Sequence, residues 1–192
     1  AVGSATGQLL TTGDNNVLLG TSAGLNSGVD VSNLVAVGTS ALAGALTIAA
    51  DGAVGVGSQA LLNLTTGGNN VAIGQNAGAA ITTGADNTLV GALSKSAAAA
   101  TNNTIIGSQA GTTALSNHNV AVGDSVLGSA DAAAFQIAIG SSAMSLGGVT
   151  GGTAATGNIA VGSSALTNLS TGTSNICIGG NTGLGFTTAA NN

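Results

Sequence analysis

The sequence predicts an all-β protein, a parallel β-solenoid of about ten coils with roughly 17 residues in each coil. A short phrase recurs along all 192 residues: Asn, a branched residue, a small residue, a branched residue, Gly, two variable residues and Ala. The glycine of this phrase returns every 16 to 19 residues, with one interval of 22. Such a period holds one short strand and its turns, and it is too short for helix-pair repeats.

The composition restricts the core to small and branched side chains. Hydrophobic residues make up 44% of the chain, yet there are only two Phe and no Trp, Tyr or Pro. Charged residues are 4% and 33 residues are Gly, unlike an ordinary globular domain, in which about 25% of residues are charged. Disorder is disfavoured because the mean hydropathy is +0.51 and the net charge is only -5. We therefore expect residues 1–192 to be a single repeat domain, a fragment of a longer fibre.

The recurring glycine, which we call the anchor glycine, divides the chain into equivalent copies. Thr-Thr-Gly phrases such as Thr65-Thr66-Gly67 lie between copies and are typical of turns. The anchor glycines are Gly3, Gly20, Gly38, Gly57, Gly74, Gly91, Gly107, Gly123, Gly140, Gly162 and Gly179.

Stacking of equivalent coils fixes the expected strand register. The anchor glycines should form columns parallel to the long axis, and Val71 should lie beside Val54 and Thr88 in adjacent coils. The longest interval, between Gly140 and Gly162, predicts the one markedly protruding loop.

Alternation along each predicted strand separates two apolar faces. The branched residues three and one before the anchor glycine, such as Val71 and Ile73, are assigned to the coil interior. The position between them is also apolar and would then face solvent in a single chain, so we expect other chains to cover it. The predicted interface residues are Leu18, Ala36, Ala72, Leu89, Ile105, Ala121, Ala138, Ala160 and Cys177.

Asn occupies the fourth position before the anchor glycine in seven copies. Stacked amides can hydrogen-bond from coil to coil as a ladder, and Asn also tolerates the left-handed conformation of a turn. Both uses are structural rather than ligand-binding. The predicted ladder residues are Asn16, Asn70, Asn87, Asn103, Asn119, Asn158 and Asn175.

The copy from Asn70 to Ala77, Asn-Val-Ala-Ile-Gly-Gln-Asn-Ala, resembles the head repeat of trimeric autotransporter adhesins of the Yersinia adhesin type. The likeness extends over nearly all copies, and the Thr-Thr-Gly-x-Asn phrase between copies is more similar to the repeats of bacteriophage tail fibres. The resemblance implies an extracellular homotrimer of left-handed parallel β-rolls on the surface of a bacterium or virion. It also implies rigid length and, in some members, attachment to a host receptor or matrix protein.

The residues give no support for catalysis or for nucleic-acid binding. Lys95 is the only basic residue, so a series of phosphates would find no counterions. His118 is expected to be a solvated turn residue, and Cys177 a small buried hydrophobe. The six acidic residues, all Asp, fall at different places in the repeat, and no apolar run is long enough to span a bilayer. We therefore expect a structural or adhesive segment without enzyme activity, cofactor, metal or membrane contact.

An ice- or surface-binding solenoid is the alternative function. Low charge and recurring Thr suit an ice-binding face, but the Thr pairs are missing from several copies and lie beside glycines in turns. A polysaccharide-degrading tailspike would need paired carboxylates in a groove, which the scattered Asp residues do not supply.

Overall fold

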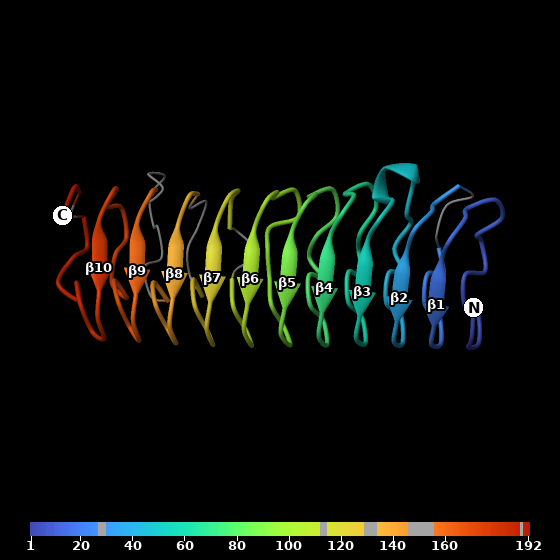
Figure 1. Cartoon of the computed structure of the whole chain (residues 1–192), viewed down its shortest axis with the longest axis horizontal. Coiled ribbons are helices and arrows are strands. Elements are labelled where there is room, and N and C mark those ends of the chain that lie inside the picture. The colour runs from blue at the N-terminus through green and yellow to red at the C-terminus, as the bar shows by residue number, and fades with distance from the viewer. Residues whose placement is uncertain (27–29, 112–114, 129–133, 146–155, 189) are drawn as a thin grey trace.

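The computed structural model describes residues 1–26, 30–111, 115–128, 134–145, 156–188 and 190–192. The chain forms a rod in which one short strand of each repeat lies beside the strand of the next repeat (Figure 1). Ten strands make a single parallel sheet in sequence order, which confirms the predicted all-β parallel solenoid. The strands are β1 (Val17–Leu19), β2 (Val35–Val37), β3 (Val54–Val56), β4 (Val71–Ile73), β5 (Thr88–Val90), β6 (Thr104–Ile106), β7 (Val120–Val122), β8 (Ile137–Ile139), β9 (Ile159–Val161) and β10 (Ile176–Ile178).

The strands pair in the predicted register. Val71 is aligned with Val54 on one side and with Thr88 on the other. The same alignment holds from β1 to β10, so each strand position forms a continuous column along the rod. Because cross-strand neighbours are equivalent residues, branched side chains stack on branched side chains in every coil.

The anchor glycines form the predicted column, and their backbone explains why they must be glycine. Gly74 has φ +135°, and a Cβ added there would lie 2.6 Å from the carbonyl carbon and oxygen of Gly91 in the next coil. The same close approach recurs from one anchor glycine to the next. Both the positive φ and the short distance between backbones exclude a side chain.

After the anchor glycine the chain turns back through left-handed residues rather than through a second strand. In the β4 coil, Asn76 and Gly78 have φ of +56° and +61°. The N–H of Asn76 donates to the carbonyl of Ser58 at 2.9 Å, and that of Gly78 donates to the carbonyl of Ser94 at 2.9 Å. This second wall of the coil is therefore hydrogen-bonded along the rod, as the sheet is.

The structure reverses the predicted faces of the strands. In every strand the middle residue is buried, whereas the two flanking residues are half-buried or exposed. Ala72 is 0% exposed within its own chain, while Ile73 beside it is 42% exposed. The branched residues assigned to the interior therefore face outward. The predicted interface residues instead lie inside their own coils: Leu18, Ala36, Ala72, Leu89, Ile105, Ala121, Ala138, Ala160 and Cys177.

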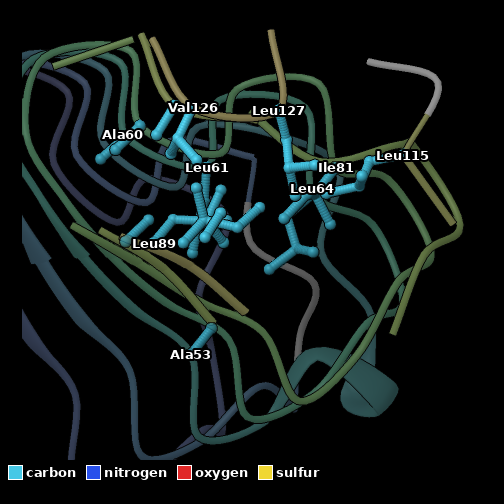
Figure 2. Close-up of a cluster of buried hydrophobic side chains, with 14 of the residues drawn as sticks. Ala53, Ala60, Leu61, Leu64, Ile81, Leu89, Leu115, Val126 and Leu127 are labelled. Carbon is cyan, nitrogen blue, oxygen red and sulfur yellow. The ribbon is translucent and has the colours of Figure 1, made fainter. Parts of the chain in front are cut away.

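The narrow interior of the coil gives the physical reason for this correction. In most coils, residues three and four after the anchor glycine enter the interior from the second wall and are buried, as are Ala60 and Leu61, each 0% exposed. Figure 2 shows buried leucines of several coils, among them Leu61, Leu89 and Leu127, gathered in the space that the coils enclose. Little room is left for the middle of the strand, so a small residue fits there and the branched residues point outward.

In eight of the ten coils, the side-chain sizes at the strand centre and four positions after the anchor glycine complement each other; Ala72 with Gly78 and Leu89 with the exposed Lys95 do not follow this pattern. A small centre accompanies a large residue in five coils: Ala36 with Leu42, Gly55 with Leu61, Ala121 with Leu127, Ala138 with Met144 and Ala160 with Leu166. A larger centre accompanies glycine in three: Leu18 with Gly24, Ile105 with Gly111 and Cys177 with Gly183. A Cβ added at Gly111 would lie 3.1 Å from Cδ1 of Ile105, and one added at Gly183 would lie 2.8 Å from Sγ of Cys177.

The 19-residue interval between Gly38 and Gly57 adds a feature at one side of the rod. The 3₁₀-helix η1 (Ile48–Ala50) lies between β2 and β3 and stands above the neighbouring turns in Figure 1. The prediction that only the interval from Gly140 to Gly162 would protrude is therefore wrong. Most of that predicted loop, residues 146–155, lies outside the described part of the chain.

Replacing an anchor glycine should destabilise the rod strongly. For Gly74→Ala we expect a loss of about 3 kcal/mol, because the new methyl group meets the Gly91 backbone and the φ is unfavourable. Thermal denaturation followed by circular dichroism measures the change. Gly185→Ala is the matched control, since a Cβ added there has no atom within 4 Å, and its melting temperature should equal that of the parent chain.

The size complementarity can be tested by a double-mutant cycle. Ala160→Leu alone should cost about 2 kcal/mol by overpacking. Combined with Leu166→Gly, it recreates the arrangement of Leu18 and Gly24, so the two changes should compensate by about 1 kcal/mol or more. Strictly additive effects in chemical denaturation would show that the two positions do not share one space.

Candidate functional site: the outward face of the sheet

The outward face of the ten-stranded sheet is an apolar surface that runs the length of the rod. Two side chains of each strand lie on it, one from each column that flanks the buried centre. We call this surface the outer sheet face; Thr88 and Thr104 are its two hydroxyl-bearing residues. Its members are Val17, Leu19, Val35, Val37, Val54, Val56, Val71, Ile73, Thr88, Val90, Thr104, Ile106, Val120, Val122, Ile137, Ile139, Ile159, Val161, Ile176 and Ile178.

The outer sheet face carries no charge. Lys95, the single basic side chain of the sequence, is exposed on the opposite wall of the β5 coil, four residues after an anchor glycine. Large side chains on the face remain accessible within the chain: Ile106 is 39% and Ile178 is 71% exposed. An exposed apolar area of this extent is typical of a surface that another macromolecule covers.

The Asn residues form the predicted ladder beside the sheet. Oδ1 of Asn70 accepts from the backbone N of Asn87 at 3.1 Å and from its Nδ2 at 3.0 Å. Oδ1 of Asn87 accepts in turn from the backbone N of Asn103 at 3.0 Å, and the pattern continues to Asn119. A second stretch joins Asn158, Asn175 and Asn192. Six of the seven predicted ladder residues are buried, and Asn16 at one end is half-buried.

The ladder also satisfies carbonyl groups of the turns. Nδ2 of Asn87 donates to the carbonyl of Ala100 at 2.8 Å, and Nδ2 of Asn158 donates to that of Gly172 at 2.9 Å. The left-handed conformation belongs instead to the preceding residue, as at Asn69 with φ +54° and Asp86 with φ +58°. The buried amides are thus fully engaged in holding coils together, which agrees with a structural use.

The remaining candidate residues lie apart from one another. His118 is exposed in a turn, as expected, and its ring stacks on that of Phe135, which sequence reasoning did not single out. Cys177 is a free, buried cysteine at a strand centre, also as expected.

Within the described ranges, no group of three His, Cys, Asp or Glu side chains could hold a metal ion. The described residues likewise include no helix of the length and hydrophobicity that a membrane span requires.

Removing a central ladder residue should weaken the rod. In Asn87→Ala, the backbone N of Asn103 and the carbonyl of Ala100 lose buried partners, so we expect a cost of about 3 kcal/mol. Asn26→Ala is the control, because its amide makes an exposed bond to the carbonyl of Ala43 and should contribute less than about 1 kcal/mol. Equal melting temperatures for both variants would contradict the ladder's role.

The chain was also compared with known proteins. Family models, curated proteins and solved structures gave no significant match. The outer sheet face and the repeat geometry are therefore the observations from which a function is inferred.

Proposed function

We propose that this chain is a structural or adhesive segment of an extracellular homotrimeric fibre, of the kind found in bacterial surface adhesins or phage tail fibres. In this proposal each chain is a left-handed β-roll, and three chains pack around a common axis through their outer sheet faces. The resulting rod gives rigid length, with attachment to a host receptor or matrix protein at other surfaces. No catalytic step is assigned to it.

The outer sheet face is the observation that carries this proposal. It is apolar at 18 of its 20 positions, uncharged throughout, and extends from β1 to β10. A surface of this length would be unfavourable in water unless it were covered. This supports the same oligomer that the sequence suggested, but through the opposite face of the strands.

A second copy of the chain is the partner that fits the face best. Side chains along it repeat at the spacing of adjacent parallel strands, about 4.8 Å, and only a chain with the same repeat stays in step over ten strands. The two columns of the face also suit threefold symmetry. Each chain can present one column to each of its two neighbours, as a closed heterologous ring requires.

The ice-binding alternative has weaker support. Oγ1 of Thr65 donates to the carbonyl of Thr82 at 2.9 Å, and Oγ1 of Thr82 donates to that of Ala98 at 3.3 Å. These hydroxyl groups are therefore used between coils rather than presented as a free array. On the outer sheet face only Thr88 and Thr104 carry hydroxyl groups. Thermal hysteresis of the purified chain would favour this alternative over the fibre.

Charges placed on the outer sheet face should prevent assembly without unfolding the coil. We expect the parent chain to have three times the chain mass of 17.6 kDa in multi-angle light scattering. The triple variant Ile73→Lys, Ile106→Lys, Ile139→Lys should have the mass of one chain and retain its β-sheet circular dichroism, because these side chains point outward.

The matched control places the same charges one residue after three anchor glycines. Ser58→Lys, Ser108→Lys, Ser141→Lys modifies exposed side chains outside the strands, so the assembly should keep the parent mass. A stable, soluble parent chain with the mass of one copy would refute the trimer.

A further inference from the structure

An aromatic pair lies exposed on the rod, outside the sheet and the core. His118 and Phe135 occupy the same position in consecutive coils, five residues before the anchor glycine. Their ring centroids are 5.0 Å apart and the ring planes differ by 8°. Phe135 is 61% exposed, whereas the other phenylalanine, Phe186, packs against the core.

The fold does not require aromatic residues at this position. Other coils place Asn69, Asp86, Asn102 or Ser174 there, with φ between +54° and +59°. Asn and Asp tolerate this left-handed region, whereas a bulky residue seldom adopts it. Phe135 has φ +58° and leaves most of its ring in water, so its position contributes little to the core.

The next rung of this column, which is the equivalent position in the following coil, carries no side chain. It is occupied by Gly157, with φ +68°, and among the described residues only Ser174 Oγ lies within 4 Å of a Cβ added there, at 3.8 Å. Gly52, the other described glycine in this column, differs, because Oδ1 of Asn69 lies 2.9 Å from its added Cβ. Adjacent rungs are about 4.8 Å apart. Among the described residues, no side chain occupies this rung between the Phe135 ring and the Ser174 hydroxyl, and we call this position the gap.

We propose that this gap binds a neutral pyranose ring of a glycan. The ring of Phe135, stacked on His118 on one face, offers its other face to the C–H face of a sugar. Ser174 Oγ supplies a hydroxyl group for the sugar's own hydroxyls. The thickness of one saturated six-membered ring suits the space that the missing side chain at Gly157 leaves.

The scarcity of Lys and Arg limits which ligands could stack on the Phe135 ring. Nucleic acids also stack on them, but their phosphates need basic residues. The single basic residue, Lys95, belongs to the β5 coil, whereas Phe135 leads into β8. No Lys or Arg is available near Phe135 to pair with an acidic sugar, and the imidazole of His118 is engaged in stacking on the far side of the Phe135 ring, so a neutral sugar fits best. This site would give the proposed fibre a ligand class, but it rests on the geometry of a single chain and not on assembly.

The sequence has only two phenylalanines, so a ¹³C-phenylalanine label reports on Phe135 and Phe186 separately. The full 192-residue chain, labelled with ¹³C-phenylalanine, is titrated with the methyl glycosides of glucose, galactose, mannose and N-acetylglucosamine, and separately with adenosine. We expect at least one glycoside to shift the ring signals of Phe135 and leave those of Phe186 in place. A Kd of about 1 mM is expected for a ligand of this size.

Two variants locate the binding. Gly157→Asn restores the usual residue of the column at a φ that Asn tolerates, fills the gap, and should weaken binding by about tenfold or more. Phe135→Asn should abolish saturation transfer to the sugar protons. Asn33→Ser, in the same column near the other end of the rod, should bind as the parent chain does. All three should keep the parent circular dichroism.

Three results would overturn the proposal. One is that no glycoside shifts the Phe135 signals, and another is that Gly157→Asn binds as tightly as the parent chain. The third is that adenosine alone binds. None of these measurements depends on molecular mass. A negative result would therefore rule out the glycan site without bearing on the trimer proposal, which light scattering tests separately.

Discussion

The contact of one coil's backbone with the next is the constraint on which the rest of the structure depends. At each anchor glycine from Gly3 to Gly162 the neighbouring backbone comes so near that no Cβ fits. This approach brings the strands into parallel register on one wall and the left-handed turns into hydrogen-bonding distance on the other. Since each coil contacts only its neighbours, the rod depends on the repetition of one local geometry rather than on a large core.

The narrow interior of the coil determines which side chains lie inside it and which lie on the surface. It holds one residue from the strand centre, residues from the opposite wall that in most coils complement it in size, and the buried Asn amides. The amides suit this space because each one satisfies polar groups of two coils at once. Branched residues that do not fit inside lie on the outer sheet face, so the packing that closes each coil also creates the apolar surface proposed for assembly.

Different columns of the same repeat can therefore serve different purposes. The columns of the outer sheet face are apolar in nearly every coil, as contact along the whole rod would require. The column five before the anchor glycine varies, from Asn and Asp to His118, Phe135 and Gly157, while its backbone conformation stays the same. A solenoid can vary these rungs because most of their side chains are exposed and lie outside the packed interior of the coils.

The sequence by itself determined the repeat, the parallel register, the glycine column and the Asn ladder, because each follows from equivalent residues recurring at a nearly constant interval. It did not determine which face of the strand is internal. Both faces are apolar, and alternation separates them without orienting them. Only the tertiary structure decided this, because the opposite wall, entering at residues such as Leu61 and Leu127, fills the interior and leaves space for a small strand centre. The stacking of His118 on Phe135 was likewise decided by the coil geometry, which brings together residues that are distant in the sequence.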